Sequence, residues 1–213
     1  NLSRATGNTS SVSSFIRSIN SGASGGSNTI DYVSFATEGN AADFGDLTAA
    51  RDRHTGISNS IRGVYAAGYS PASPSFSNVI DYITMASTGN ATDFGDLATS
   101  RYNHGGASSS TRAVAIGGNT QTSIEFLTIA SQGNGIDYGD LTSGRQTDSV
   151  SNSVRAVNYG GSTSPALQNT IDFFTITNGG TATDFGDAVQ NIFRSRGSSN
   201  SHGGLNDGYQ GTR

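Results

Sequence analysis

The triplet Asp93-Phe94-Gly95 has the residue types with which protein kinases bind magnesium. The triplet belongs to a longer Asp-aromatic-Gly-Asp motif, whose four copies begin at Asp43, Asp93, Asp137 and Asp184. A kinase needs its magnesium motif once, together with a strand lysine, a glycine-rich loop and a His-Arg-Asp catalytic loop. The chain contains no lysine at all, so kinase chemistry is excluded and the four copies indicate an architectural role.

Oxygen ligands for calcium are the functional alternative at these motifs, because Asn90, Asp93 and Asp96 could all coordinate that ion. The dense alternating acids of an EF-hand loop are missing, however. We therefore expect a structural role, in which the aromatic ring packs between neighbouring sheets. The glycine would allow a bulge or a close backbone approach, and the two aspartates would accept hydrogen bonds from turn amides. No catalytic, cofactor-binding or metal-binding residue is predicted, and a calcium ion near the motif stays the alternative.

Three histidines, His54, His104 and His202, are the other candidates for chemistry. His54 and His104 occupy the same position in two repeats, which predicts a separation of roughly 20 Å or more unless both face a central axis. The chain has no cysteine, so disulfides and thiolate metal sites are excluded. Serine is too abundant for any one residue to be nominated as a nucleophile.

Two series of opposite charge recur with the repeat. The acidic series is spaced by 50, 44 and 47 residues, like the Asp-aromatic-Gly-Asp motifs, and an arginine series runs beside it. Because a guanidinium group meets a carboxylate with two hydrogen bonds, we expect a ladder of ion pairs between these series. The acidic series is Asp31, Asp81, Glu125 and Asp172, and the arginine series is Arg17, Arg62, Arg112 and Arg155.

Composition indicates a β-rich chain with many turns rather than one large core. Of the 213 residues 29 are glycine, 33% are hydrophobic and 13% are charged. Disorder is the alternative for such a composition, but the periodic Ile, Val, Phe and Tyr argue against it. The net charge of −4 and the lack of any basic run exclude a nucleic-acid partner. No apolar stretch is long enough to predict a membrane span.

Segments upstream and downstream of each motif repeat as well, and alternating residues predict that they are strands. In the 79–87 stretch, Ile80 and Tyr82 would face one side and Asp81, Ile83 and Met85 the other, as in a strand covered on both faces. We expect four short strands in a repeat, for example over 105–110, 112–118, 79–87 and 92–97, with their order around the repeat left open.

A period of 44 to 50 residues with four strands, one followed by a glycine pair, is typical of a propeller blade. The sequence resembles kelch-type β-propellers in "RDRH" (51–54), "RYNH" (101–104), "SSSTRAVAIGG" (108–118) and "NVIDY" (78–82). The resemblance implies an all-β, kelch-like β-propeller. Enzymes of this fold carry a cysteine-linked tyrosine or Ser-x-Asp-x-Gly-x-Thr-Trp boxes, and the chain has neither, so we expect no enzymatic activity.

A second resemblance covers nearly the whole chain. The "GNATDFGDL" repeat and the "SNSHGGL" segment (199–205) are similar to those of structural proteins from tailed bacteriophages of marine cyanobacteria. This implies a non-enzymatic virion component, such as a tail fibre, baseplate or capsid-surface protein, that binds other virion proteins or copies of itself. The alternative is a glycan-binding module for a host cell surface. Exposed loop aromatics would favour that alternative, and Tyr69, Phe76 and Tyr102 are available.

Counting the repeat segments predicts about five blades, one of them incomplete, in a single repeat domain over 1–213. The expected units are 1–50, 51–100, 101–144, 145–190 and a half unit over 191–213. One half-blade lacks its counterpart, so we expect the natural polypeptide to extend further, with the missing half before Asn1. Otherwise a bare strand edge must be covered by a neighbour, and open ends could also join subunits into a filament. Recognition is expected in the variable loops 68–76 and 118–123.

Overall fold

The structure is a computed structural model that describes residues 7–71, 75–163 and 166–193. The described residues contain sixteen β-strands and no helix. The strands form four antiparallel sheets of four strands each, which confirms the all-β class predicted from the sequence. Within the described ranges there is accordingly no helix of the length and apolarity needed to cross a membrane.

The four sheets follow one another along the chain. The first consists of β1 (Ser10–Ser13), β2 (Arg17–Ser21), β3 (Ser27–Ser34) and β4 (Ala42–Arg51). The second consists of β5 (Thr55–Ser58), β6 (Arg62–Tyr69), β7 (Phe76–Thr84) and β8 (Thr92–Asp96). The third consists of β9 (Gly105–Ser108), β10 (Arg112–Ile116), β11 (Ser123–Thr128) and β12 (Ile136–Asp140). The fourth consists of β13 (Gln146–Ser151), β14 (Arg155–Ser162), β15 (Leu167–Thr175) and β16 (Thr183–Ile192).

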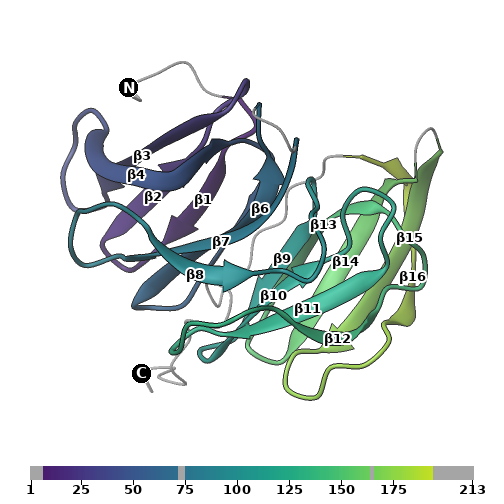
Figure 1. Cartoon of the computed structure of the whole chain (residues 1–213). Coiled ribbons are helices and arrows are strands. Elements are labelled where there is room, and N and C mark those ends of the chain that lie inside the picture. The colour runs from purple at the N-terminus through teal and green to yellow at the C-terminus, as the bar shows by residue number, and fades with distance from the viewer. Residues whose placement is uncertain (1–6, 72–74, 164–165, 194–213) are drawn as a thin grey trace.

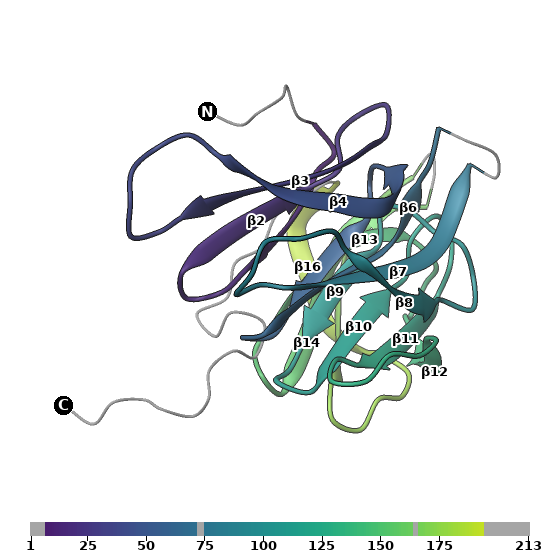
Figure 2. The ribbon, with the colours of Figure 1, turned by 60° about the vertical axis from the view of Figure 1, so that its left-hand side comes forward.

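Each sheet is a meander in which consecutive strands are neighbours (Figure 1). The first strands of the sheets, β1, β5, β9 and β13, contact one another in succession, so the sheets are arranged side by side around a common centre (Figure 2). This arrangement fits that of a β-propeller. The predicted half unit at the C-terminal end has its strand-like segment at 198–209, which lies outside the described residues.

Strand pairing decides the order that the sequence left open. The strand expected over 112–118 is β10, which ends at Ile116 and pairs with β11. The strand expected over 79–87 is β7, which begins at Phe76, ends at Thr84 and pairs with β6. Each sheet therefore begins with the two strands before a glycine-rich turn and ends with the two strands that follow it. The Asp-aromatic-Gly-Asp motif lies in the last strand of each sheet, far from the common centre.

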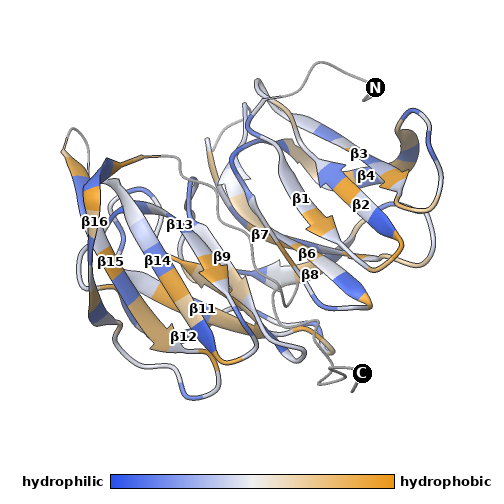
Figure 3. Cartoon of the chain, turned by 180° about the vertical axis from the view of Figure 1, so that it is seen from behind, coloured by the Kyte–Doolittle hydropathy of each residue, from blue (hydrophilic) through white to orange (hydrophobic). Residues whose placement is uncertain are grey.

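The hydrophobic core lies between neighbouring sheets. Ile80 of β7 packs with Leu127 of the third sheet, whereas Ile83 and Met85 pack with Ile30 of the first sheet. Both faces of β7 are therefore covered, as the alternation of its residues predicted. Figure 3 shows hydrophobic segments within the strands of the sheets, where such packing needs them.

Backbone hydrogen bonds connect the last strand of each of the first three sheets to the loop ahead of the last strand in the next sheet. We call each such connection a joint. At the first joint, the amide of Gly89 donates to the carbonyl of Phe44 and the amide of Ala91 donates to that of Asp46, both at 2.7 Å. The same pair of bonds is found at the second joint (Gly133 to Phe94, Gly135 to Asp96) and the third (Gly180 to Tyr138, Ala182 to Asp140).

The glycine of the motif explains why the two backbones can come so close at a joint. Gly95 has a φ of 142°, sits beside a register shift between β7 and β8, and lies directly against Gly133. A Cβ atom added to Gly95 would lie 2.6 Å from the carbonyl oxygen of Gly133. The glycine therefore allows both a bulge and a close approach, the two roles predicted for it.

Candidate binding site

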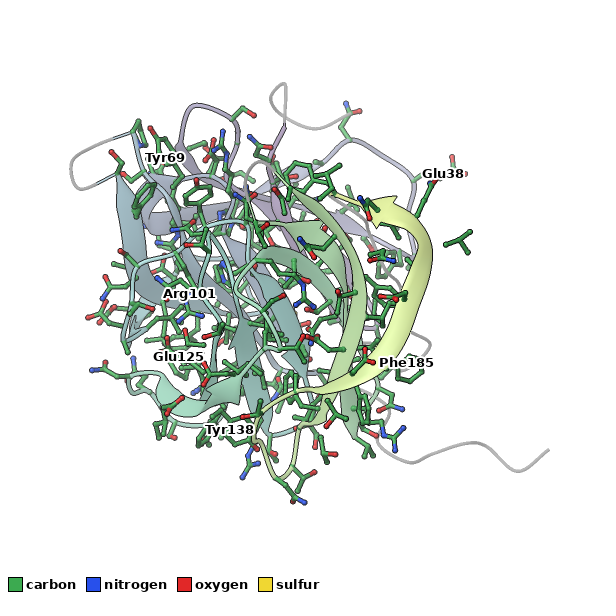
Figure 4. All side chains as sticks on the ribbon, turned by 90° about the vertical axis from the view of Figure 1, so that its right-hand side faces the viewer. Glu38, Tyr69, Arg101, Glu125, Tyr138 and Phe185 are labelled. Atoms are coloured by element: carbon green, nitrogen blue, oxygen red, sulfur yellow. The ribbon has the colours of Figure 1, made fainter. Side chains whose placement is uncertain are left out.

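Buried ion pairs link neighbouring sheets beneath the joints. In each pair an arginine just after the Asp-aromatic-Gly-Asp motif meets an acid in the third strand of the next sheet. The pairs are Arg51–Asp81 at 2.8 Å, Arg145–Asp172 at 3.0 Å, and Arg101–Glu125, which Figure 4 shows in the interior. The carboxylate of Asp81 also accepts hydrogen bonds from the hydroxyl and the amide of Thr48. Burial lowers the pKa of Arg51, and the nearby Asp81 opposes that shift.

The sequence prediction was right about a repeated acidic series that meets arginines but wrong about which arginines. Arg62, a member of the predicted series, is opposite Thr84 in the register, three residues from Asp81. Because strand side chains alternate, Arg62 and Asp81 point to opposite faces of the sheet. The arginines that do pair are found in the "RDRH" and "RYNH" segments and at Arg145.

The arginines of the predicted series stack on aromatic rings instead. The guanidinium carbon of Arg62 lies 4.7 Å from the ring centroid of Tyr82, and its Nη1 donates to the carbonyl of Ile129 in the next sheet at 2.8 Å. Equivalent cation–π contacts are made by Arg17 with Tyr32, Arg112 with Phe126, and Arg155 with Phe173. These partly exposed contacts cover the outer core rather than form a ligand-binding ring.

In two copies an aspartate of the motif accepts a hydrogen bond from a backbone amide, as predicted, but the amide belongs to the same strand and not to a turn. Asp137 accepts from the amide of Gly139 at 3.3 Å, and Asp184 accepts from that of Gly186 at 3.2 Å. Among the residues that the structure describes, no group of three or more His, Asp or Glu side chains is placed to hold a metal ion.

A polar cavity lies at the centre of the four sheets, and we call it the axial cavity. Its volume is about 370 Å³, and residues of β5, β9 and β13, or next to them, line it together with residues at the start of the first sheet. Most of the lining groups are hydroxyls, amides, imidazoles and backbone. The lining includes Arg53, His54, Asn103, His104, Gln146 and Asp148.

Both described histidines line the axial cavity, so the separation of roughly 20 Å that was predicted for residues away from the axis does not apply to them. They are close enough that His104 contributes to lowering the pKa of His54. Burial is the main cause in both rings, and it lowers the pKa of His104 to about 3. Both imidazoles are therefore uncharged at neutral pH. The prediction of a large separation made an exception for residues that face the central axis, and these two histidines belong to that exception. The third histidine, His202, lies outside the described residues.

A serine–histidine contact that sequence reasoning did not single out occurs beside the cavity. The hydroxyl of Ser21 and Nε2 of His54 are 2.7 Å apart, a distance that would suit a nucleophile and its base. Ser21 is completely buried, however, and Nδ1 of His54 has no hydrogen-bond partner, such as an orienting carboxylate, among the described residues. The contact therefore packs the second sheet against the first and does not present a nucleophile to a substrate.

The three loop aromatics named from the sequence come together beside the axial cavity, and we call them the aromatic cluster. Phe76 and Tyr102 stack with ring centroids 5.1 Å apart, and Tyr69, labelled in Figure 4, lies edge-on to Tyr102 at 6.3 Å. The guanidinium carbon of Arg53 is 5.4 Å from the ring of Tyr69 and 5.7 Å from that of Tyr102. Tyr69 and Phe76 are opposite each other in the hairpin of β6 and β7, but spacing alone could not show that Tyr102 would join them.

Comparison with known proteins does not indicate a family for this chain. No protein-family model matches the chain, and no curated protein matches it in sequence.

Proposed function

We propose that the chain is a non-enzymatic scaffold of a virion, such as a tail fibre, baseplate or capsid-surface component. Its proposed fold is a kelch-like β-propeller of about five blades, one of them incomplete in this chain. The virion location is supported by the resemblance of the repeats to phage structural proteins. The scaffold role is supported by the exposed outer faces of the first and fourth sheets, at the two ends of the sheet array.

The first sheet exposes a hydrophobic residue whose equivalents in the other three sheets are buried. Phe35 follows β3 at the position held by Met85, Ile129 and Ile176 in the other three sheets. Those three side chains are completely buried against the preceding sheet, whereas Phe35 is 59% exposed. The face of the first sheet that would meet a preceding sheet is therefore apolar and uncovered.

The fourth sheet exposes the opposite half of the same interface. Phe185 is 58% exposed, while its equivalents Phe44 and Phe94 are each 2% exposed. Figure 4 shows Phe185 on the outermost strand β16, beyond which no further sheet is drawn. A Cβ atom on Gly186 would meet nothing within 4 Å, although the equivalent glycines lie directly against the next sheet.

These end faces are the two halves of one joint. A partner that presents the same repeat would bury Phe35 or Phe185 as the internal joints bury their equivalents, and a second copy of this chain presents both halves. Contacts of this head-to-tail kind build rings or filaments. We therefore propose other copies of the chain, or virion proteins with the same repeat, as partners.

Sedimentation velocity tests this proposal. We expect the chain to associate as its concentration rises, and Phe185→Ser to weaken association by about tenfold or more, as loss of a buried interface aromatic does. Ile61→Ser is the control, because Ile61 is similarly exposed at 63% but lies in the turn between β5 and β6. A chain that stays monomeric at all concentrations, or equal effects of the two variants, would contradict the scaffold role.

A glycan-binding module is the second candidate function. The observation that favours it is the aromatic cluster beside a polar cavity, because stacked rings next to hydrogen-bonding groups suit a sugar.

A further inference from the structure

We propose that the axial cavity and the aromatic cluster form one binding site for an uncharged, hydroxyl-rich saccharide. The inference rests on the second candidate function and specifies where the glycan binds and which chemical class it belongs to. One sugar unit occupies the axial cavity, and the adjoining unit lies on the aromatic cluster.

Arg53 connects the two parts of the site. Arg53 lines the axial cavity, and its guanidinium group lies over the rings of Tyr69 and Tyr102. Asn103, which directly follows Tyr102, also lines the cavity, and its amide donates to the side chain of Gln146 at 3.0 Å. Cavity and rings are therefore parts of one continuous surface.

Hydrogen-bonding side chains in the lining indicate that the cavity takes a ligand with hydroxyl groups. Asn103 and Gln146 contribute amide groups, and Ser10 and Ser149 contribute hydroxyl groups. A side-chain amide offers two N–H donors and a carbonyl acceptor, and a hydroxyl group can both donate and accept. A hydroxyl group of the ligand can therefore accept from these side chains and donate to them.

The charges at the site favour an uncharged ligand. Both histidines are neutral because burial lowers their pKa. The positive charge of Arg53 is offset by the carboxylate of Asp52, with Nε and Oδ1 3.8 Å apart. Asp148 adds a negative group to the lining, so a carboxylate- or sulfate-bearing sugar would meet no excess positive charge.

The aromatic cluster supplies the apolar part of the contact. Phe76 is on the surface, and its ring stacks on Tyr102 with an interplanar angle of 26°. A pyranose ring has an apolar C–H face, whose slightly positive hydrogens are attracted to the negative face of an aromatic ring. The cavity volume of about 370 Å³ lies within the usual range for small-molecule sites, about 300–1,000 Å³.

An array of neutral, sialylated, uronic and sulfated oligosaccharides, probed with the intact chain, tests the proposal. Neutral glycans should bind, and titration calorimetry with the best of them should show losses of about tenfold or more for Phe76→Ala, Tyr102→Ala and Gln146→Ala. Phe15→Ala is the matched control, because Phe15 is an exposed aromatic in the turn between β1 and β2. That control should bind within about twofold of the unchanged chain.

The outcomes separate the site from the function. Binding of neutral glycans that survives all three substitutions would keep the glycan-binding function but overturn this site. Binding of charged glycans alone would overturn the ligand class, and no binding to any glycan would overturn the function itself. Phe76 is an exposed residue, so Phe76→Ala keeps the test decisive even if another of these variants does not fold.

Discussion

The side chains of Arg51, Arg101 and Arg145 are completely buried, and each guanidinium group reaches from one sheet to the next. A buried pair of this kind contributes little net stability compared with apolar residues, but it leaves a large penalty when one partner is removed. At the scale of single residues, these pairs therefore fix how neighbouring sheets are placed.

Replacement of Arg101 with methionine should leave Glu125 buried without its counter-charge. We expect the free energy of unfolding in urea to fall by about 3–5 kcal/mol. The double variant Arg101→Met/Glu125→Leu should recover most of that loss. Arg155→Ala, which removes an exposed cation–π contact with Phe173, should cost about 0.5–1 kcal/mol. Equal losses for Arg101→Met and Arg155→Ala would show that the buried pair has no special role.

The buried histidines make stability depend on pH. The pKa of His104 is about 3 in the folded chain, against an ordinary value of 6.5. The unfolded chain therefore binds a proton below pH 6.5 that the folded chain does not bind until about pH 3, so stability falls as the pH falls between these values. At pH 5 the loss from His104 should be about 2 kcal/mol relative to neutral pH, and His54 adds to it in the same direction.

Urea unfolding at a series of pH values measures this effect. His104→Gln should flatten the decline between neutral pH and pH 5, whereas Arg155→Ala should leave its slope unchanged. Identical slopes in the unchanged chain and in His104→Gln would show that His104 is protonated in the folded state or exposed to solvent.

At the scale of elements, the joint is the recurring unit of construction. The last strand of one sheet bulges at a glycine, buries an aromatic ring and accepts two backbone hydrogen bonds from the next sheet. The fourth sheet carries the same motif but has no following sheet among the described residues, so it serves as an internal control for what a joint contributes.

Gly95→Ala should therefore be more destabilising than Gly186→Ala. Both glycines have φ values that disfavour a side chain, 142° and 135°, so each substitution introduces backbone strain of about 1–3 kcal/mol. Only at Gly95 would the new methyl group also collide with a neighbouring sheet, at Gly133. Thermal unfolding should show a clearly larger fall in Tm for Gly95→Ala. A similar fall for both variants would mean that the joint adds nothing beyond local strain.

Much of the structure at the scale of elements could be predicted from the sequence, because repeated motifs and residues that alternate between the two faces of a strand are local signals. The strands over 79–87 and 112–118, the packing of β7 on both faces and the role of the motif glycine were all predictable. The partner of Asp81 was not predicted, since the pairing arginine arrives from another sheet. Tyr69 and Phe76 are cross-strand partners in the hairpin of β6 and β7, so their contact is local. The contact of Tyr102 with both rings, and the approach of His54 to His104, depend on how the sheets are placed around the centre, which no local pattern encodes.

At the scale of the whole molecule, the array has two unlike ends. Phe35 lies at the end formed by the first sheet and Phe185 at the end formed by the fourth, and both are exposed where internal equivalents are buried. The central claim is that repeated motifs build joints, and that the same joint is available for a partner at the ends.

Amide hydrogen exchange measured by NMR tests this claim most directly. The joint amides of Gly89, Ala91, Gly133, Gly135, Gly180 and Ala182 should be protected as strongly as those inside the sheets. Gly39 and Ala41 hold the equivalent positions in the first sheet. Their amides should exchange quickly in dilute solution and become protected as the chain associates at higher concentration. Rapid exchange at the internal joints, or no change at Gly39 and Ala41 upon association, would contradict the account.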